Sequence, residues 1–125
     1  MNTDYSTKQP TKGNQIVSLS EVFALKMLPK CKALKSIGEI ELANQLFKSS
    51  TSVGANIAES QHAESKADFV HKLKIAAKEA RESEFWMKII AQSDIEIDFH
   101  AEAEILLSIQ KLLSSIISTC LKSKF

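Results

Sequence analysis

The chain has 125 residues, of which 44% are hydrophobic and only three are Gly and two are Pro, a composition typical of one domain built from long helices. Sixteen basic residues against 15 acidic ones leave a formal net charge of +1, which excludes a strong overall field that would attract nucleic acid. The sequence contains neither an unbroken apolar run of about 18 residues nor an apolar stretch close to Met1, so we expect no membrane span and no signal peptide.

The first 15 residues contain Pro10, Gly13 and almost nothing to bury, which predicts a disordered tail, with residues 16–125 forming the folded domain. The first helix is predicted over about 20–36, with Ser20 as its N-cap. Pro29 predicts a kink or a break within it. Its apolar side chains form one broad face: Val22, Phe23, Met27, Leu28, Cys31, Leu34 and Ile37.

Gly38 predicts a left-handed cap between this helix and a second one over about 39–62. The middle of the second helix is rich in small residues, namely Ser49, Ser50, Ser52, Gly54, Ala55 and Ala58. A Gly costs about 1 kcal/mol relative to Ala inside a helix, so we expect the close approach of another helix backbone to offset Gly54. Asn56 lies near the predicted buried face, where its amide needs hydrogen-bond partners.

Ser65 is the predicted N-cap of a third helix over about 66–92, with Asp68 in its first turn. The core stripe of this helix recurs every 3.5 residues, the period of a left-handed bundle: Phe69, Leu73, Ala76, Ala80, Ser83, Met87 and Ile90. Off this stripe lie Ile75, Trp86 and Ile89, which are either additional core or a subunit interface.

A fourth helix is predicted over about 98–122, with a stripe of Phe99, Ala103, Leu106, Ile109, Leu113, Ile116 and Cys120. Short links between long helices make them antiparallel neighbours. The sequence therefore predicts an all-α, one-domain, antiparallel up-down-up-down four-helix bundle. Cys31 and Cys120 both lie on apolar stripes, which favours buried thiols in a reducing cytoplasm over a disulfide.

Two carboxylate-x-x-His pairs have the spacing of metal ligands, Glu59 with His62 and Asp68 with His71. A di-iron bundle also needs two further Glu in mid-bundle, whereas these pairs lie near one end, so we predict no metal and no other cofactor. The chain has no Gly-rich phosphate loop and no nucleophile elbow.

Glu79 and Glu82 are the paired carboxylates that come nearest to an acid–base arrangement. They stand beside Lys78, Arg81 and Lys88 and are interpreted as structural ion pairs. We therefore predict that the protein is not an enzyme.

Two helices carry basic faces that can contact phosphates by counterion release, although a solvated helix surface has the same pattern. On the first helix these residues are Lys26, Lys30, Lys32 and Lys35, and on the third they are Lys74, Lys78, Arg81 and Lys88.

Three segments carry a family resemblance: SVGANIAE at 52–59, SKADF at 65–69 and AKEARESEFW at 77–86. Together with the flanking helices, about residues 20–122 resemble the four helix bundle protein family, also called the S23 or 23S rRNA intervening-sequence-encoded protein family. The sequence departs from the family at Pro29, a position that is usually not Pro. The motif residues, read as structural, are Gly54, Asn56, Glu59, Glu79, Glu82 and Trp86.

The resemblance implies an antiparallel four-helix subunit, often assembled as a homopentamer, whose biochemical role is largely undefined. The accessory variability proteins of diversity-generating retroelements look like relatives and imply nucleic-acid binding and a reverse-transcriptase partner. Two hypotheses follow from these residues. One is a non-enzymatic, cytoplasmic, oligomeric interaction protein that partners itself, and the alternative is an RNA- or DNA-binding accessory protein.

Overall fold

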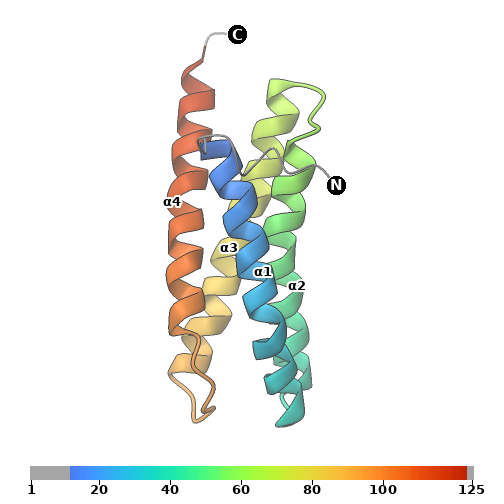
Figure 1. Ribbon diagram of the computed structural model, residues 1–125, viewed down its shortest axis with the longest axis vertical. Coiled ribbons are helices and arrows are strands. Elements are labelled where there is room, and N and C mark those ends of the chain that lie inside the picture. The colour runs from blue at the N-terminus through green and yellow to red at the C-terminus, as the bar shows by residue number, and fades with distance from the viewer. Residues whose placement is uncertain (1–11, 124–125) are drawn as a thin grey trace.

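Four helices make up the fold of the computed structural model, which describes residues 12–123. They are α1 (Lys12–Ser36), α2 (Ile40–Ser60), α3 (Lys66–Ala91) and α4 (His100–Lys122), and the described part of the chain contains no strand. Successive helices run in opposite directions along one axis (Figure 1). The predicted all-α, antiparallel four-helix bundle is confirmed.

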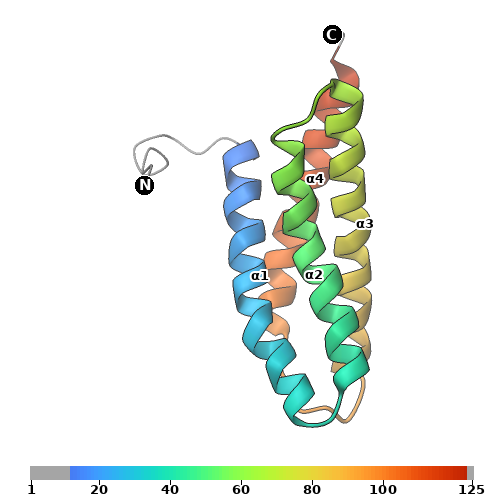
Figure 2. The ribbon, with the colours of Figure 1, turned by 90° about the vertical axis from the view of Figure 1, so that its right-hand side faces the viewer.

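Each helix packs against the one that follows it, and α4 closes the bundle by packing against α1. In the described residues, α1 makes no close backbone contact with α3, nor α2 with α4. The two helices α1 and α3 therefore occupy opposite corners of the bundle (Figure 2). This arrangement decides which surface residues can act together.

Both predicted capping motifs are present at the turns. Gly38 has a φ of +92°, and the N–H groups of Gly38 and Glu39 donate to the carbonyls of Lys35 and Leu34 at 3.0 and 2.9 Å, which is a Schellman motif. At the next turn, the Ser65 side chain accepts from the Asp68 N–H at 3.0 Å. These two caps end α1 and begin α3.

The predicted core stripe of α3 is confirmed. Phe69 is partly buried against the core, and the other stripe residues are buried: Leu73, Ala76, Ala80, Ser83, Met87 and Ile90. Ser83 Oγ also donates to Ser49 Oγ of α2 at 2.9 Å. Ser49 is one of the small residues of α2, and this buried pair of hydroxyl groups is a direct polar contact between α2 and α3.

Gly54 faces α1, as its predicted close approach to another helix requires. A Cβ at Gly54 would lie 3.5 Å from the Cβ, Oγ and carbonyl oxygen of Ser20. That separation is ordinary van der Waals contact, so α1 comes close but leaves room for a methyl group.

The helix α1 differs from its prediction at its start. It begins at Lys12 rather than near Ser20, so residues 12–15 are helical rather than part of a tail, and residues 1–11 lie outside the described residues. Ser20 is not an N-cap, because it lies inside the helix and its hydroxyl donates to the Val17 carbonyl at 2.9 Å. Ile16 is buried, and this contact with the core favours the additional helical turns.

The predicted break at Pro29 is wrong, because α1 is one continuous helix. Pro29 lies on the exposed side of α1, where water can bond the carbonyl that the missing N–H of proline leaves without a partner.

The buried side of α1 is also narrower than predicted. Its buried members are Ile16, Ser20, Phe23, Met27, Cys31 and Leu34. Val22, Leu28 and Ile37, which were expected in the core, are exposed instead.

The core stripe of α4 contains one polar substitution. Phe99, Leu106, Ile109 and Leu113 are buried as predicted, but Ala103 is exposed and Glu102 takes the buried position. Positions 99, 102, 106, 109 and 113 keep the 3.5-residue period of a bundle seam, so Glu102 takes the place in the seam that was expected for Ala103.

By length and composition alone, α4 is also the one helix of the described residues that passes a test for crossing a membrane. A single helix of this kind is weak evidence of a membrane span; 17% of its apolar window is buried, and α4 packs against both α1 and α3.

Candidate functional site

The basic residues predicted on the third helix share one side of α3. Lys74, Lys78, Arg81 and Lys88 are all exposed. The ion pairs among the described residues are Lys72 with Glu59 and His100 with Glu104. The four cations on α3 therefore have no acidic partner in the part of the chain that the structure describes.

The predicted ion pairs of Glu79 and Glu82 with these cations are accordingly absent from residues 12–123. Glu82 Oε2 instead accepts a hydrogen bond from Trp86 Nε1 at 3.2 Å. The indole ring also meets Phe85 edge-on, with centroids 5.2 Å apart, and packs against the core. Trp86 thus contacts the core while it stays partly exposed, and its role in a subunit interface stays a prediction.

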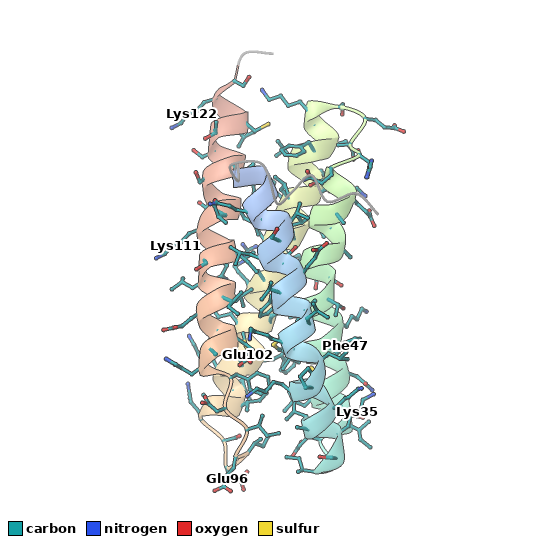
Figure 3. The ribbon with its side chains drawn as sticks, viewed as in Figure 1. Lys35, Phe47, Glu96, Glu102, Lys111 and Lys122 are labelled. Carbon is teal, nitrogen blue, oxygen red and sulfur yellow. The ribbon has the colours of Figure 1, made fainter. Side chains whose placement is uncertain are left out.

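A groove of about 820 Å³ runs between α3 and the later part of α4. Its cations are Lys74 and Arg81 of α3 and Lys122 of α4, and α4 adds the hydroxyls of Ser114 and Ser118. Lys111 and Lys122 both extend outward from α4 (Figure 3). This recess, named the α3–α4 groove, carries Lys74, Arg81 and Lys122 against the single carboxylate of Glu84. It therefore offers net positive charge and hydrogen-bond donors to an anionic ligand.

A hydrogen bond separates this groove from a second recess nearer the other end of the bundle. Gln110 Nε2 donates to Glu84 Oε1 at 3.2 Å, and both residues line both recesses. The second recess, here the α3–α4 hollow, has a volume of about 650 Å³. It is lined mainly by apolar side chains, among them Met87, Ile95, Ile97, Phe99, Leu106 and Leu107.

The lysines predicted on the first helix do not form one surface with those of α3. Lys26, Lys32 and Lys35 are exposed on α1, which stands at the opposite corner of the bundle from α3 (Figure 2). The amine of Lys30 is engaged, because it donates to the Asp98 carbonyl and lies 5.8 Å from the centroid of the Phe99 ring. Within one subunit, the predicted nucleic-acid residues thus fall into two separate sets.

The remaining motif residues make local contacts. Asn56 is partly buried, and its Nδ2 donates to the Ser52 carbonyl at 2.8 Å. Glu59 Oε1 accepts from Lys72 Nζ at 2.9 Å, and this contact raises the pKa of Lys72. The Lys72–Glu59 contact connects the end of α2 to α3, whereas the Asn56 hydrogen bond stays within α2.

The carboxylate–histidine pairs are not brought together as ligands. Glu59 is bonded to Lys72, Asp68 Oδ2 accepts from the Glu64 N–H at 3.2 Å, and His62 and His71 are exposed. Among the described residues, no group of three or more His, Cys, Asp or Glu side chains is placed to hold a metal ion.

The two cysteines are free thiols, as predicted, but only Cys31 is buried, and Cys120 is partly exposed. Burial raises the pKa of Cys31 to about 11, with a small opposing effect from nearby Lys35. A thiol that stays protonated at neutral pH is a poor nucleophile.

Sequence reasoning missed the contributions of α4. Glu102 is only 6% exposed, and its Oε1 has no hydrogen-bond partner among the described residues; it lies between α4 and α1 (Figure 3). Ser114, Ser118 and Lys122 follow no recognisable motif, and only the packing of α4 beside α3 reveals that they complete the groove.

The helical fold and the surfaces described above define a four-helix bundle protein with two recesses between α3 and α4 and with exposed apolar side chains. The model of the 23S rRNA-intervening sequence protein family matches residues 12–118, and the chain belongs to this family. Neither this family description nor the neighbour described next names a catalytic activity.

Among solved structures, the chain is similar to a protein of unknown function from the S23 ribosomal protein family of Bacteroides thetaiotaomicron. The two are 35% identical, with a TM-score of 0.82, over 86% of this chain and 99% of that one. A search of curated proteins gave no match.

Proposed function

We propose that this protein is a non-enzymatic, cytoplasmic interaction protein that assembles with copies of itself, as a homopentamer if it follows the family resemblance. The observation that carries the proposal is the exposure of large apolar side chains on α1, α3 and α4, among them Leu25, Phe85, Ile89 and Leu107. Some of these side chains are neighbours, such as Phe85 and Ile89 one turn apart on α3, and neighbouring exposed apolar side chains on a small domain mark an interaction site.

Light scattering coupled to size-exclusion chromatography tests this proposal. The chain has a mass of 13.9 kDa, and the expected particle is five times heavier. A particle of 13.9 kDa at micromolar concentration would exclude self-assembly, and an assembly with another number of copies would overturn only the pentamer.

The second candidate function is binding of RNA or DNA, with a reverse transcriptase as the protein partner that the retroelement relatives imply. It is supported by the α3–α4 groove, where Lys74, Arg81 and Lys122 lie beside serine hydroxyls. Assembly would repeat this groove around a ring, and several weak phosphate contacts would then act together.

Fluorescence anisotropy with a short RNA and a duplex DNA at about 50 mM salt tests this function. The double variant Lys74→Gln/Arg81→Gln is expected to bind more weakly, with a shallower salt dependence. Lys48→Gln, which removes an exposed lysine from α2, is the matched control. Absence of binding by the unmodified protein would exclude the second function.

A further inference from the structure

The outer side of α1 carries a second set of apolar residues, in addition to the set that faces the core. Val22, Leu25 and Leu28 are 40%, 70% and 39% exposed, and their spacing of three places them side by side on the helix. They are named the α1 ridge. Because α1 packs only against α2 and α4, nothing among residues 12–123 covers this ridge.

The α3–α4 hollow is a concave counterpart to the convex ridge. Its volume of about 650 Å³ accommodates several leucine-sized side chains. Leu107, which lines it, is 49% exposed, although a leucine normally gains about 1.5–3 kcal/mol when it is fully buried. The ridge and the hollow are therefore two solvent-exposed apolar surfaces, one convex and the other concave.

The charges around the two surfaces are also of opposite sign. The ridge is flanked on α1 by two exposed lysines, Lys26 and Lys32, and by one exposed carboxylate, Glu21, so its surroundings carry a net positive charge. The hollow is lined by three carboxylates, Glu84, Glu96 and Asp98, with Lys88 as the one lysine among its lining residues. Such complementarity favours contact between unlike surfaces and disfavours pairing of two ridges, which would bring lysines together.

The ridge and the hollow lie at the same height along the bundle. Lys30, which follows the ridge by two residues, contacts the Asp98 carbonyl and the Phe99 ring, and both Asp98 and Phe99 line the hollow. Because α1 and α4 are antiparallel, the ridge and the α4 residues of the hollow extend from this contact toward the same end of the bundle. Rotation about an axis parallel to the bundle changes no heights, so it can bring the ridge of one copy to the hollow of the next.

From these observations we infer that the α1 ridge of one copy packs into the α3–α4 hollow of a second copy, with Lys26 and Lys32 facing the carboxylates of the hollow. The contact is heterologous, so its repetition produces a closed ring when the rotation between copies closes. This inference rests on the proposed self-assembly and adds the two surfaces that perform it.

Two single substitutions test the two surfaces separately, with particle mass from light scattering as the readout. Leu25→Glu places a carboxylate on the ridge, and Leu107→Glu adds a fourth carboxylate to the hollow. Each is expected to reduce the mass to the 13.9 kDa of one chain. Leu121→Glu is the matched control, because Leu121 is 57% exposed on α4 and lies outside the hollow; it should leave the mass unchanged.

Mixing the two variants distinguishes this contact from every symmetric one. The Leu25→Glu chain keeps an intact hollow and the Leu107→Glu chain keeps an intact ridge, so the mixture should form a particle of twice 13.9 kDa. Helical circular dichroism of each variant alone confirms that it is folded, as expected for substitutions at exposed positions.

The results separate the two proposals. If the unmodified protein is assembled but either variant stays assembled, the inferred contact is wrong and self-assembly stands. If both variants are folded monomers that do not pair, heterologous packing of ridge and hollow is wrong. If the unmodified protein is itself a monomer, self-assembly and this contact fail together.

Discussion

Replacement of Gly54 by alanine is expected to stabilise this protein. Glycine inside a helix costs about 1 kcal/mol relative to alanine, because the unfolded chain loses more conformational freedom. The new methyl group would lie 3.5 Å from its nearest neighbours, all atoms of Ser20, which is contact without overlap. We expect a gain of about 1 kcal/mol in the free energy of unfolding, corresponding to roughly 3–5 °C in Tm for a chain of this size.

Urea denaturation followed by circular dichroism measures this change, provided that the assembly state is held constant. Ala55→Gly is the matched control, because Ala55 is the exposed neighbour of Gly54 on α2 and should lose about 1 kcal/mol for the same reason. If Gly54→Ala lowers stability while Ala55→Gly behaves as expected, the contact between α1 and α2 is tighter than 3.5 Å implies and the reasoning is refuted.

Three further predictions concern the caps, the core and the thiols. Ser65→Ala should cost about 1 kcal/mol of unfolding free energy in urea titrations, because α3 loses its N-cap, and an unchanged midpoint would contradict that role. Ser83→Ala should cost about 1 kcal/mol, but less in a protein that already carries Ser49→Ala, because the two hydroxyls bond each other; additive effects in this double-mutant cycle would show that they are uncoupled. Since burial raises the pKa of Cys31 from 9.0 to about 11, the folded state keeps a proton that the unfolded state releases, so stability should be intact below pH 9 and fall toward pH 11. Cys31→Ala should reduce this fall and Cys120→Ala should not; equal slopes in all three proteins would refute the assignment.

The sequence was most informative where local chemistry decides the structure. Gly38 favours a left-handed backbone, and Ser65 followed by Asp68 is a capping pattern. The sequence therefore predicts the individual residue that caps each of these two turns. The 3.5-residue repeat of α3 predicted its buried side because the opposite side is charged.

The sequence was least informative for α1, which is apolar on two sides. Periodicity cannot distinguish the side that meets α2 and α4 from the side with Leu25, and it placed Val22 and Leu28 in the core. The start of α1 depends on burial of Ile16 against distant parts of the chain. Likewise, Ala103 is a better apolar match than Glu102, and only the packing of α4 shows which one turns inward.

The α3 cations of the candidate site were among the predicted residues, but its α4 residues and the grouping of the side chains were not. The basic side chains of the first and third helices were identified correctly as exposed sets, apart from Lys30, which is engaged with Asp98. Their separation follows from the placement of α1 and α3 at opposite corners. The contribution of Lys122 to the groove follows from α4 lying beside α3, which no local pattern encodes.

The alternating directions of the helices also give the molecule two unlike ends. The first residue of α1 and the last residue of α4 lie at the end that carries the α2–α3 turn, while the other two links lie at the opposite end (Figure 1). Copies arranged side by side around a common axis would therefore present the start of every α1 and the end of every α4 on the same rim. A fluorescent protein joined to the last residue of α4 would decorate that rim and leave the opposite face of the particle bare.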